Sequence, residues 1–165
     1  MSGSTVESAV QLATGSWPTG SYPAKLDEKG RMKLASDLLG FFASEPDTRI
    51  FVTTIMPGIA SMYPMRVWQK NLELLGQAGE NFKQASALQF WANAHGANTA
   101  LDNQGRVLIP QVLRTKLELE AEGLVLVPYG QRIDIYRQSH YEAKMLELAT
   151  SVETAFEFFQ AKGLM

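Results

Sequence analysis

The 165-residue sequence contains no cysteine, and this absence excludes disulfide frameworks, thiolate zinc sites, iron–sulfur clusters and cysteine nucleophiles. No apolar run approaches the ~20 residues that a membrane-spanning helix needs. The first twenty residues contain neither lysine nor arginine, and they lack the apolar core of a signal peptide. We therefore expect a soluble, intracellular protein.

The sequence also lacks a strong charge of either sign, since its formal net charge at pH 7 is −2. A role in nucleic-acid binding would therefore require positive charge to gather locally. Hydrophobic residues make up 45% and charged residues 19% of the chain, a balance typical of globular proteins and not of disordered ones. A chain of this length buries roughly 70% of its unfolded surface, so it needs no metal or disulfide to fold.

Sequence motifs of common enzymes are missing as well. The chain has no G-x-S-x-G, Walker A or G-x-G-x-x-G string. Its two histidines, His95 and His140, have no second metal ligand at the i+4 position. The segment from Asp102 to Gly105 lacks the alternating oxygen ligands of a calcium loop. We therefore expect no catalytic activity, no metal and no cofactor.

A nine-residue segment occurs twice in the chain. Residues 26–34, LDEKGRMKL, recur 75 residues later as residues 101–109, LDNQGRVLI, with four identical positions and two more that remain apolar. Each copy precedes a short helical stretch and then two strand-like runs, joined by a turn that contains proline and glycine. This repetition predicts two homologous halves. The expected strands are 49–54 and 61–63 in the first half, and 124–127 and 133–136 in the second.

Apolar residues at helical spacing predict three longer helices. The first begins near Pro64 and ends at Gly76, the second spans residues 80–95, and the third spans residues 141–159 with nearly heptad spacing. Ser139, followed by Glu142 three residues on, is the expected N-cap of the third helix. The apolar positions expected to face a core or a subunit are Met65, Trp68, Leu72 and Leu75; Phe82, Ala85, Leu88 and Trp91 or Ala92; and Tyr141, Met145, Leu148, Val152, Phe156 and Phe159.

The repeated segment contains the pattern Asp-x-x-Gly-Arg. The aspartate can accept hydrogen bonds from the backbone N–H groups of a turn, and glycine at the fourth position tolerates positive φ. The arginine that follows projects from the start of the outgoing strand. Asp27 can therefore pair with Arg31, and Asp102 with Arg106. A surface ion pair of this kind can serve only to close a turn, which is one interpretation of both loops.

Positive charge gathers around both copies of the loop. The first copy has a local excess of two positive charges, and so does the second, where Arg114 and Lys116 join Arg106. Residues 117–165, by contrast, carry a net charge of −4. This distribution favours a second interpretation, in which the loops meet the phosphates of a nucleic acid and the helices lie elsewhere.

With these two loops, the chain resembles the MraZ family of bacterial transcriptional regulators, which is related to AbrB-type regulators. Further support comes from the strings MYPMRVWQKNLELL, AHGANTALDNQGRVLIPQVLR and IDIYRQSHYEAK, so that the resemblance covers roughly residues 22–150. It implies an α+β fold of two tandem swapped-hairpin AbrB-like β-barrel halves, related by a pseudo-two-fold axis, with helices after each half. The implied segments are a first repeat with its helix at 21–76, a connecting helix at 77–97, and a second repeat with the C-terminal helix at 98–165. Residues 1–20 exceed the family pattern, and their polar composition, rich in serine, threonine and glycine, predicts a flexible tail.

The resemblance also implies a function. Members of the family form ring-shaped homo-oligomers in the cytoplasm, associated with the nucleoid. They bind tandem G-rich boxes upstream of the division and cell-wall gene cluster, usually as repressors. The loops would contact double-stranded DNA, with arginines reading guanine, lysines meeting phosphates and the remaining positions supporting the loop. On this chain the DNA-binding residues would be Arg31, Arg106, Lys25, Lys29 and Lys33, and the loop-supporting residues Asp27, Gly30, Asp102 and Gly105.

The first repeat departs from the second after its loop. Ala35 and Leu39 stand where the second repeat has Pro110 and Arg114. We therefore expect the second loop to have basic support that the first loop lacks. An alternative function is an antitoxin-like or structural protein-interaction module with the same barrel. In that case the arginines would act as turn clamps, and the C-terminal helix would bind a partner protein.

Overall fold

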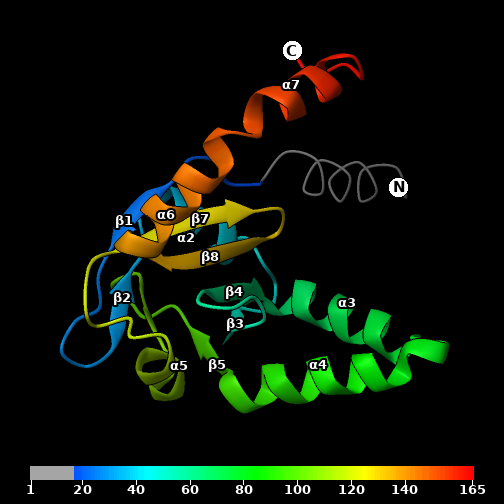
Figure 1. Cartoon of the computed structure of the whole chain (residues 1–165). Coiled ribbons are helices and arrows are strands. Elements are labelled where there is room, and N and C mark those ends of the chain that lie inside the picture. Colours follow the sequence, from blue (N-terminus) through cyan, green and yellow to red (C-terminus); the bar gives the residue numbers. More distant parts are fainter. Residues whose placement is uncertain (1–16) are drawn as a thin grey trace, which may run out of the picture.

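The structure is a computed structural model, and it describes residues 17–165 of the chain. Of the expected tail at 1–20, residues 1–16 therefore lie outside the described residues. The described chain is α+β, as the sequence predicts (Figure 1). Its elements are β1 (Tyr22–Ala24), β2 (Arg31–Lys33), α2 (Ser36–Ala43), β3 (Arg49–Thr53), β4 (Ala60–Pro64), α3 (Met65–Gly76), a 3-10 helix η1 (Gly79–Asn81), α4 (Phe82–His95), β5 (Ala97–Ala100), β6 (Arg106–Leu108), α5 (Gln111–Lys116), β7 (Leu124–Tyr129), β8 (Arg132–Arg137), α6 (Gln138–Ala149) and α7 (Val152–Gln160).

The four strands expected from the repeat are present as β3, β4, β7 and β8. Each half contributes one antiparallel hairpin, β3–β4 and β7–β8. The turn of the first hairpin contains Gly58 at φ 82°, and the turn of the second contains Gly130 at φ 58°. Both values fall in the left-handed region that glycine adopts without steric cost. The Pro-Gly turn pattern therefore predicted both hairpins correctly.

The two halves contribute strands to one sheet, in which the hairpin of each half lies between strands of the other half. The six-stranded sheet has the order β1-β7-β8-β4-β3-β5, and β2 pairs with β6 in a separate two-stranded ribbon. Every pairing is antiparallel. The counterparts in the two repeats are β1 and β5, β3 and β7, and β4 and β8. When each strand is replaced by its counterpart, the sheet keeps the same strand order, read from its opposite edge. The two repeats are thus units of sequence, and neither has a sheet of its own.

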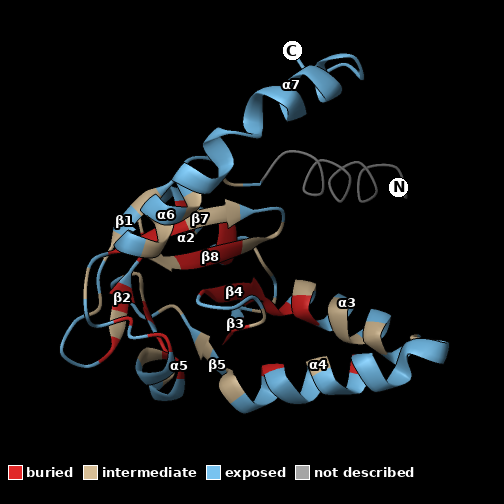
Figure 2. Ribbon diagram, in the orientation of Figure 1, coloured by how far each residue is buried: buried red, intermediate tan, exposed pale blue. Residues whose placement is uncertain are grey.

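The main core fills the space between one face of the sheet and the β2–β6 ribbon with α2 and α5 (Figure 2). Met32 of the ribbon and Val107 opposite it are both fully buried. They meet alternate residues of the four central strands, as expected for sheets with one buried face. Each large apolar side chain buried in this way contributes roughly 1.5–3 kcal/mol. The sheet residues of this core are Ile50, Val52, Ala60, Met62, Leu124, Leu126, Ile133 and Ile135.

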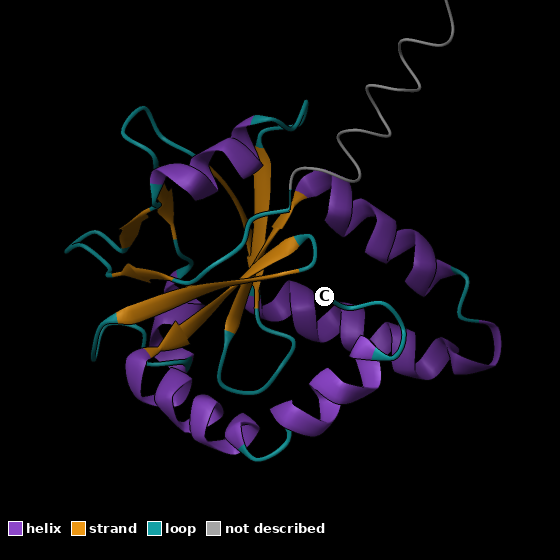
Figure 3. Cartoon of the chain, turned by 90° about the horizontal axis from the view of Figure 1, so that it is seen from above, coloured by secondary structure: helices purple, strands orange, loops and turns teal. Residues whose placement is uncertain are grey.

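Helices cover the opposite face of the sheet. Viewed from above, the helices of both faces lie around the strands (Figure 3). The first predicted long helix is α3, whose Trp68 packs against Phe51 and Tyr63 with ring centroids 4.6 and 5.0 Å apart. In addition, the Thr53 hydroxyl donates a 2.6 Å hydrogen bond to the carbonyl of Ala92 and ties α4 to β3. A second, smaller core therefore holds α3 and α4 against the outer face of β3 and β4.

The expected apolar face of α4 is only partly correct. Ala85 and Ala92 are buried, but Phe82 and Trp91 are 63% and 44% exposed. Because α4 packs closely against α3 and β3, its inward face consists of small residues. The large aromatic side chains, including Phe90, are exposed.

The single helix expected at 141–159 is two helices, α6 and α7, interrupted at Thr150 and Ser151. The hydroxyls of these two residues donate to the carbonyls of Glu147 and Leu148, and such bonds compete with the helical pattern. The expected N-cap at Ser139 is also wrong. The cap position is Arg137, without a side-chain cap, and the backbone N–H of Ser139 instead donates to the Glu122 carboxylate. Within residues 17–165, no helix is long and apolar enough to cross a membrane.

A buried polar contact joins the two halves at the centre of the sheet. Ser61 of β4 lies directly opposite Asp134 of β8. The Ser61 hydroxyl donates a 2.6 Å hydrogen bond to Asp134, which is only 3% exposed. Arg132 donates to the same carboxylate from Nε at 2.9 Å. The carboxylate is therefore paired and hydrogen-bonded, as a buried charge must be.

We expect Asp134→Ala to lower the free energy of unfolding by about 1–3 kcal/mol, because the buried Ser61 hydroxyl loses its acceptor. Urea denaturation followed by circular dichroism measures this. Glu147→Ala is the matched control, since it removes only an exposed pair with Lys144, at 3.7 Å, and should leave the midpoint unchanged. Equal midpoints for Asp134→Ala and the parent protein would contradict a structural role for this contact.

Candidate nucleic-acid interface

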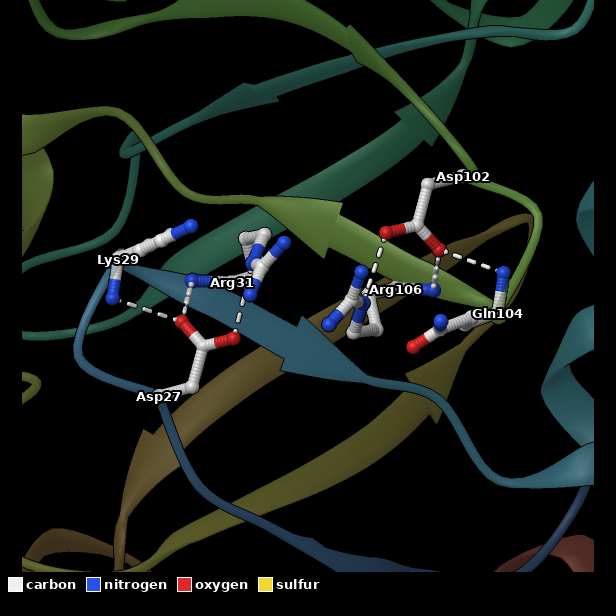
Figure 4. Close-up of polar contacts among 6 residues, drawn as sticks. All are labelled: Asp27, Lys29, Arg31, Asp102, Gln104 and Arg106. Carbon is white, nitrogen blue, oxygen red and sulfur yellow. Dashed lines mark hydrogen bonds and ion pairs between the residues drawn. The ribbon is translucent and has the colours of Figure 1, made fainter.

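The two Asp-x-x-Gly-Arg loops have the same hydrogen-bond pattern (Figure 4). In the first loop, Asp27 Oδ1 accepts from the backbone N–H groups of Lys29 and Arg31, both at 2.9 Å. In the second loop, Asp102 Oδ1 accepts from Gln104 at 2.8 Å and from Arg106 at 2.9 Å. Each loop is thus a turn wrapped around one carboxylate oxygen, as the sequence pattern predicts.

The second oxygen of each aspartate binds the arginine side chain. Arg31 Nε lies 2.9 Å from Asp27 Oδ2, and Arg106 Nε lies 2.7 Å from Asp102 Oδ2. Both expected ion pairs are therefore present. The two arginine side chains are 30% and 24% exposed. Among the described residues, no group accepts a hydrogen bond from Nη1 or Nη2 of either arginine, so the aspartate orients the guanidinium and leaves its outer edge available.

The arginines emerge from a ribbon to which both halves contribute. Arg31 lies opposite Leu108, and Arg106 lies opposite Lys33. The backbone N–H of Leu34 donates to Gly105 and that of Ile109 donates to Gly30, so each loop is bonded to the strand of the other repeat. Met32 and Val107 fill the inner face of the ribbon. Because directly opposed residues share a face, both arginines lie on the outer face.

The glycines of the loops are contacted by residues of the opposite repeat. Gly30 has φ 78°, and a Cβ there would lie 2.4 Å from the Arg114 guanidinium carbon. Gly105 has φ 73°, and a Cβ there would lie 3.0 Å from Leu39. Arg114 thus packs on the first loop, and Leu39 packs on the second. The expectation that Arg114 supports the second loop is wrong, because the two repeats exchange these contacts across the ribbon.

The positive charge expected beside the second loop is largely engaged elsewhere. Arg114 is 18% exposed, donates to the carbonyl of Ile109 and forms a 2.7 Å ion pair with Glu120. Lys116 lies over the Trp91 ring, 4.9 Å from its centroid. The expected lysines of the first repeat, by contrast, are exposed and form no ion pair with any residue in 17–165. They are Lys25, Lys29 and Lys33.

The sequence comparisons identify the family. The family model described as "MraZ protein, putative antitoxin-like" matches residues 93–159. The protein named Transcriptional regulator MraZ from Solidesulfovibrio magneticus is 30% identical over 141 residues, which is 84% of this chain and 91% of the relative. Its namesake from Pediococcus pentosaceus is 31% identical over 128 residues, 78% of this chain and 86% of the relative. The chain belongs to the MraZ family.

Other similarities add little to this assignment. The Transcriptional regulator MraZ of Acidobacterium capsulatum is 30% identical over 106 residues, 64% of this chain and 73% of the relative. The solution structure of PHS018 from Pyrococcus horikoshii matches at 12% identity with a TM-score of 0.30, over 70% of this chain and 84% of that one. That likeness is too low to bear on the fold.

The histidines of this MraZ chain have local partners. His95 Nδ1 lies 2.9 Å from the carbonyl of Trp91, one turn earlier in α4. His140 lies against the β3–β4 turn, where its Nδ1 is 3.3 Å from the carbonyl of Gly58. No cluster of three metal-ligating side chains occurs within the part of the chain that the structure describes.

Both loop aspartates of the MraZ chain have lowered pKa values. Hydrogen bonds from the backbone N–H of the loop arginine are the largest cause, opposed by partial desolvation, and the arginine side chain and the next N–H group lower the pKa further. A lowered pKa in the folded state means that ionisation stabilises the fold above the unfolded value. This stability is lost as the pH falls through the folded pKa.

We therefore expect the Asp27 and Asp102 carboxyl groups to titrate below the ordinary value of 3.8. Carboxyl carbon NMR shifts recorded between pH 2 and 6 measure both pKa values. The loops should keep their geometry throughout the range above pH 4 and loosen only below it. Titration of either group at or above 3.8 would contradict the hydrogen-bonded loop.

Proposed function

We propose that this chain is a sequence-specific, DNA-binding transcriptional regulator without catalytic activity. Its relatives in the MraZ family are named transcriptional regulators. The observation that carries the proposal is the outer face of the β2–β6 ribbon, which presents Arg31 and Arg106 together. Each guanidinium is oriented by an aspartate at Nε and offers its Nη edge outward.

The arrangement suits the major groove of DNA. A two-stranded β-ribbon fits the groove, and a guanidinium can donate two hydrogen bonds to guanine O6 and N7. With Nε held by aspartate, Nη1 and Nη2 remain as the donor pair for this contact. Lys25, Lys29 and Lys33 would meet phosphates and fix the register. Asp27 and Asp102 would orient the arginines without touching DNA.

The proposal includes a swapped-hairpin AbrB-like barrel whose two halves are related by a pseudo-two-fold axis. Three features support it. The strand order of the sheet reads alike from both ends, the ribbon pairs equivalent strands, and the loop glycines are contacted by equivalent residues of the opposite repeat. Such an axis would place the two arginines in matching surroundings within one chain.

We further propose that the chain forms a ring-shaped homo-oligomer. One ribbon offers few contacts, but several copies joined in a ring would bind tandem G-rich boxes with high avidity. These boxes would lie upstream of the division and cell-wall genes, and binding would repress those genes. In support, α6 and α7 expose large apolar side chains that are typical of subunit interfaces: Met145, Leu146, Leu148, Val152, Phe156, Phe158 and Phe159.

Multi-angle light scattering after size exclusion should therefore give a mass of several chains. The variant Phe156→Asp, Phe159→Asp should give a lower mass with an unchanged circular dichroism spectrum, because charge on a buried interface is costly. Glu157→Gln, on the same helix, is the matched control and should leave the mass unchanged. A monomeric parent protein at micromolar concentrations would contradict the ring.

A second candidate function, an antitoxin-like protein-interaction module, is favoured by the same exposed helices. The Asp–Arg ion pairs would then only close their turns. Under this alternative, Arg31→Ala and Arg106→Ala would loosen the loops, and the parent protein would not discriminate between DNA sequences.

Fluorescence anisotropy distinguishes the two functions. The probes are a duplex from upstream of the protein's own gene and a scrambled duplex, each at two salt concentrations. We expect tight, salt-sensitive binding to the first duplex. Arg31→Ala and Arg106→Ala should each weaken specific binding by about 1–3 kcal/mol for every base that the arginine reads, with unchanged circular dichroism. Equal, weak binding to both duplexes would contradict the proposed regulator.

A further inference from the structure

The strand register places three cations side by side. Lys33 of β2 lies directly opposite Arg106 of β6. On its other side, the bridge between Leu26 and Met32 brings Lys25 opposite Lys33 in the same hairpin. Lys25 and Lys33 also line one groove together. Directly opposed side chains have Cβ atoms about 4.5–5.5 Å apart, so Lys25, Lys33 and Arg106 form one row across three strand segments. We name this the cationic row.

The equivalent row of the other repeat has a different chemistry. Arg31 corresponds to Arg106, and the residue opposite Arg31 is Leu108, which is 51% exposed. Leu108 corresponds in sequence to Lys33, and Ala100 corresponds to Lys25. We name the pair of Leu108 and Arg31 the apolar row, after its leucine. Two loops with the same hydrogen bonds therefore stand in unlike surroundings, one cationic and one apolar.

The cationic row is expensive for the folded chain. Like charges directly opposite one another destabilise a β pair. Asp102 pairs with Arg106, but within the described residues no carboxylate forms an ion pair with Lys25 or Lys33. An exposed leucine on the opposite row contributes nothing to the core either. The opposed lysines therefore cost stability, and they face the side of the ribbon that carries the arginines. Such local conflicts mark surfaces shaped for a ligand.

We propose that the two rows divide DNA recognition between them. This division rests on the proposed DNA-binding function. Lys25 and Lys33 bind the phosphate backbone beside Arg106, although they belong to the repeat of Arg31. Leu108 contacts base edges beside Arg31, although it belongs to the repeat of Arg106. An apolar side chain next to a guanine-reading arginine is suited to a thymine methyl group in the major groove.

The chemistry predicts two separable effects. Phosphate contacts act on every sequence and add about 0.9 each to the log–log slope of affinity against salt. A methyl contact acts only on duplexes with thymine at the right position, and it leaves the salt slope alone. Lys25 and Lys33 should therefore contribute affinity for every duplex, whereas Leu108 should contribute only to the discrimination of sites that carry thymine.

The test is a salt titration by fluorescence anisotropy with the upstream and the scrambled duplex. The double variant Lys25→Gln, Lys33→Gln should weaken binding to both duplexes by the same factor and lower the slope by about 1.8 per engaged subunit. It should also unfold at a higher temperature, which shows that the fold survives. Lys70→Gln, Lys83→Gln, on the exposed faces of α3 and α4, is the matched control and should change neither quantity.

Leu108→Ala is tested on the upstream duplex with thymine and with uracil throughout. The parent protein should bind the uracil duplex more weakly, because uracil lacks the methyl group. Leu108→Ala should bind the thymine and the uracil duplex with equal affinity. Its salt slope and its affinity for the scrambled duplex should equal those of the parent protein.

The division is overturned if the double lysine variant keeps the salt slope of the parent protein, or if it loses affinity only for the upstream duplex. It is overturned as well if Leu108→Ala binds the upstream and the scrambled duplex more weakly by the same factor, or if it still binds the thymine duplex more tightly than the uracil duplex. In each of these cases specific binding by the parent protein persists, so the proposed regulator stands. A parent protein that binds neither duplex contradicts the proposed function and the division together.

Discussion

The pairing of β2 with β6 joins the two repeats at the main core and at both loops. These two short strands come from different repeats, and their buried residues Met32 and Val107 close the main core. Their outer residues include both loop arginines. Since the N–H groups of Leu34 and Ile109 bond the loop glycines of the opposite repeat, neither loop has its observed geometry without the other half. One antiparallel pairing therefore serves the core and the candidate interface at once.

The same pairing determines where charge acts. Sequence proximity assigns Arg114 to the second loop and Lys33 to the first. The structure places the Arg114 guanidinium against Gly30 and Lys33 beside Arg106. Each loop is thus surrounded by side chains of the other repeat, and the electrostatics of the face follow the register of the ribbon. Repeated in the proposed ring, a small patch of this kind would bind DNA although the whole chain is slightly acidic.

Local features of the sequence predicted local features of the structure. The Asp-x-x-Gly-Arg pattern predicted both turns and both ion pairs, because every group involved lies within five residues. The hairpins and α3 followed from turn residues and apolar spacing. Contacts between the repeats could not be predicted, since the exchange of Arg114 and Leu39 depends on how the strands alternate in space. The break between α6 and α7 was missed, because apolar spacing continues through Thr150 and Ser151 while their hydroxyls end the helix.

The two arginines are proposed to meet guanine edges in the major groove. Dimethyl sulfate methylates guanine N7, and its reaction with the protein–DNA complex reports this contact. The parent protein should protect two sets of guanines in the operator, Arg31→Ala should expose one set, and Arg106→Ala should expose the other. A bound complex in which every guanine N7 reacts as in the duplex alone would contradict the proposed contact.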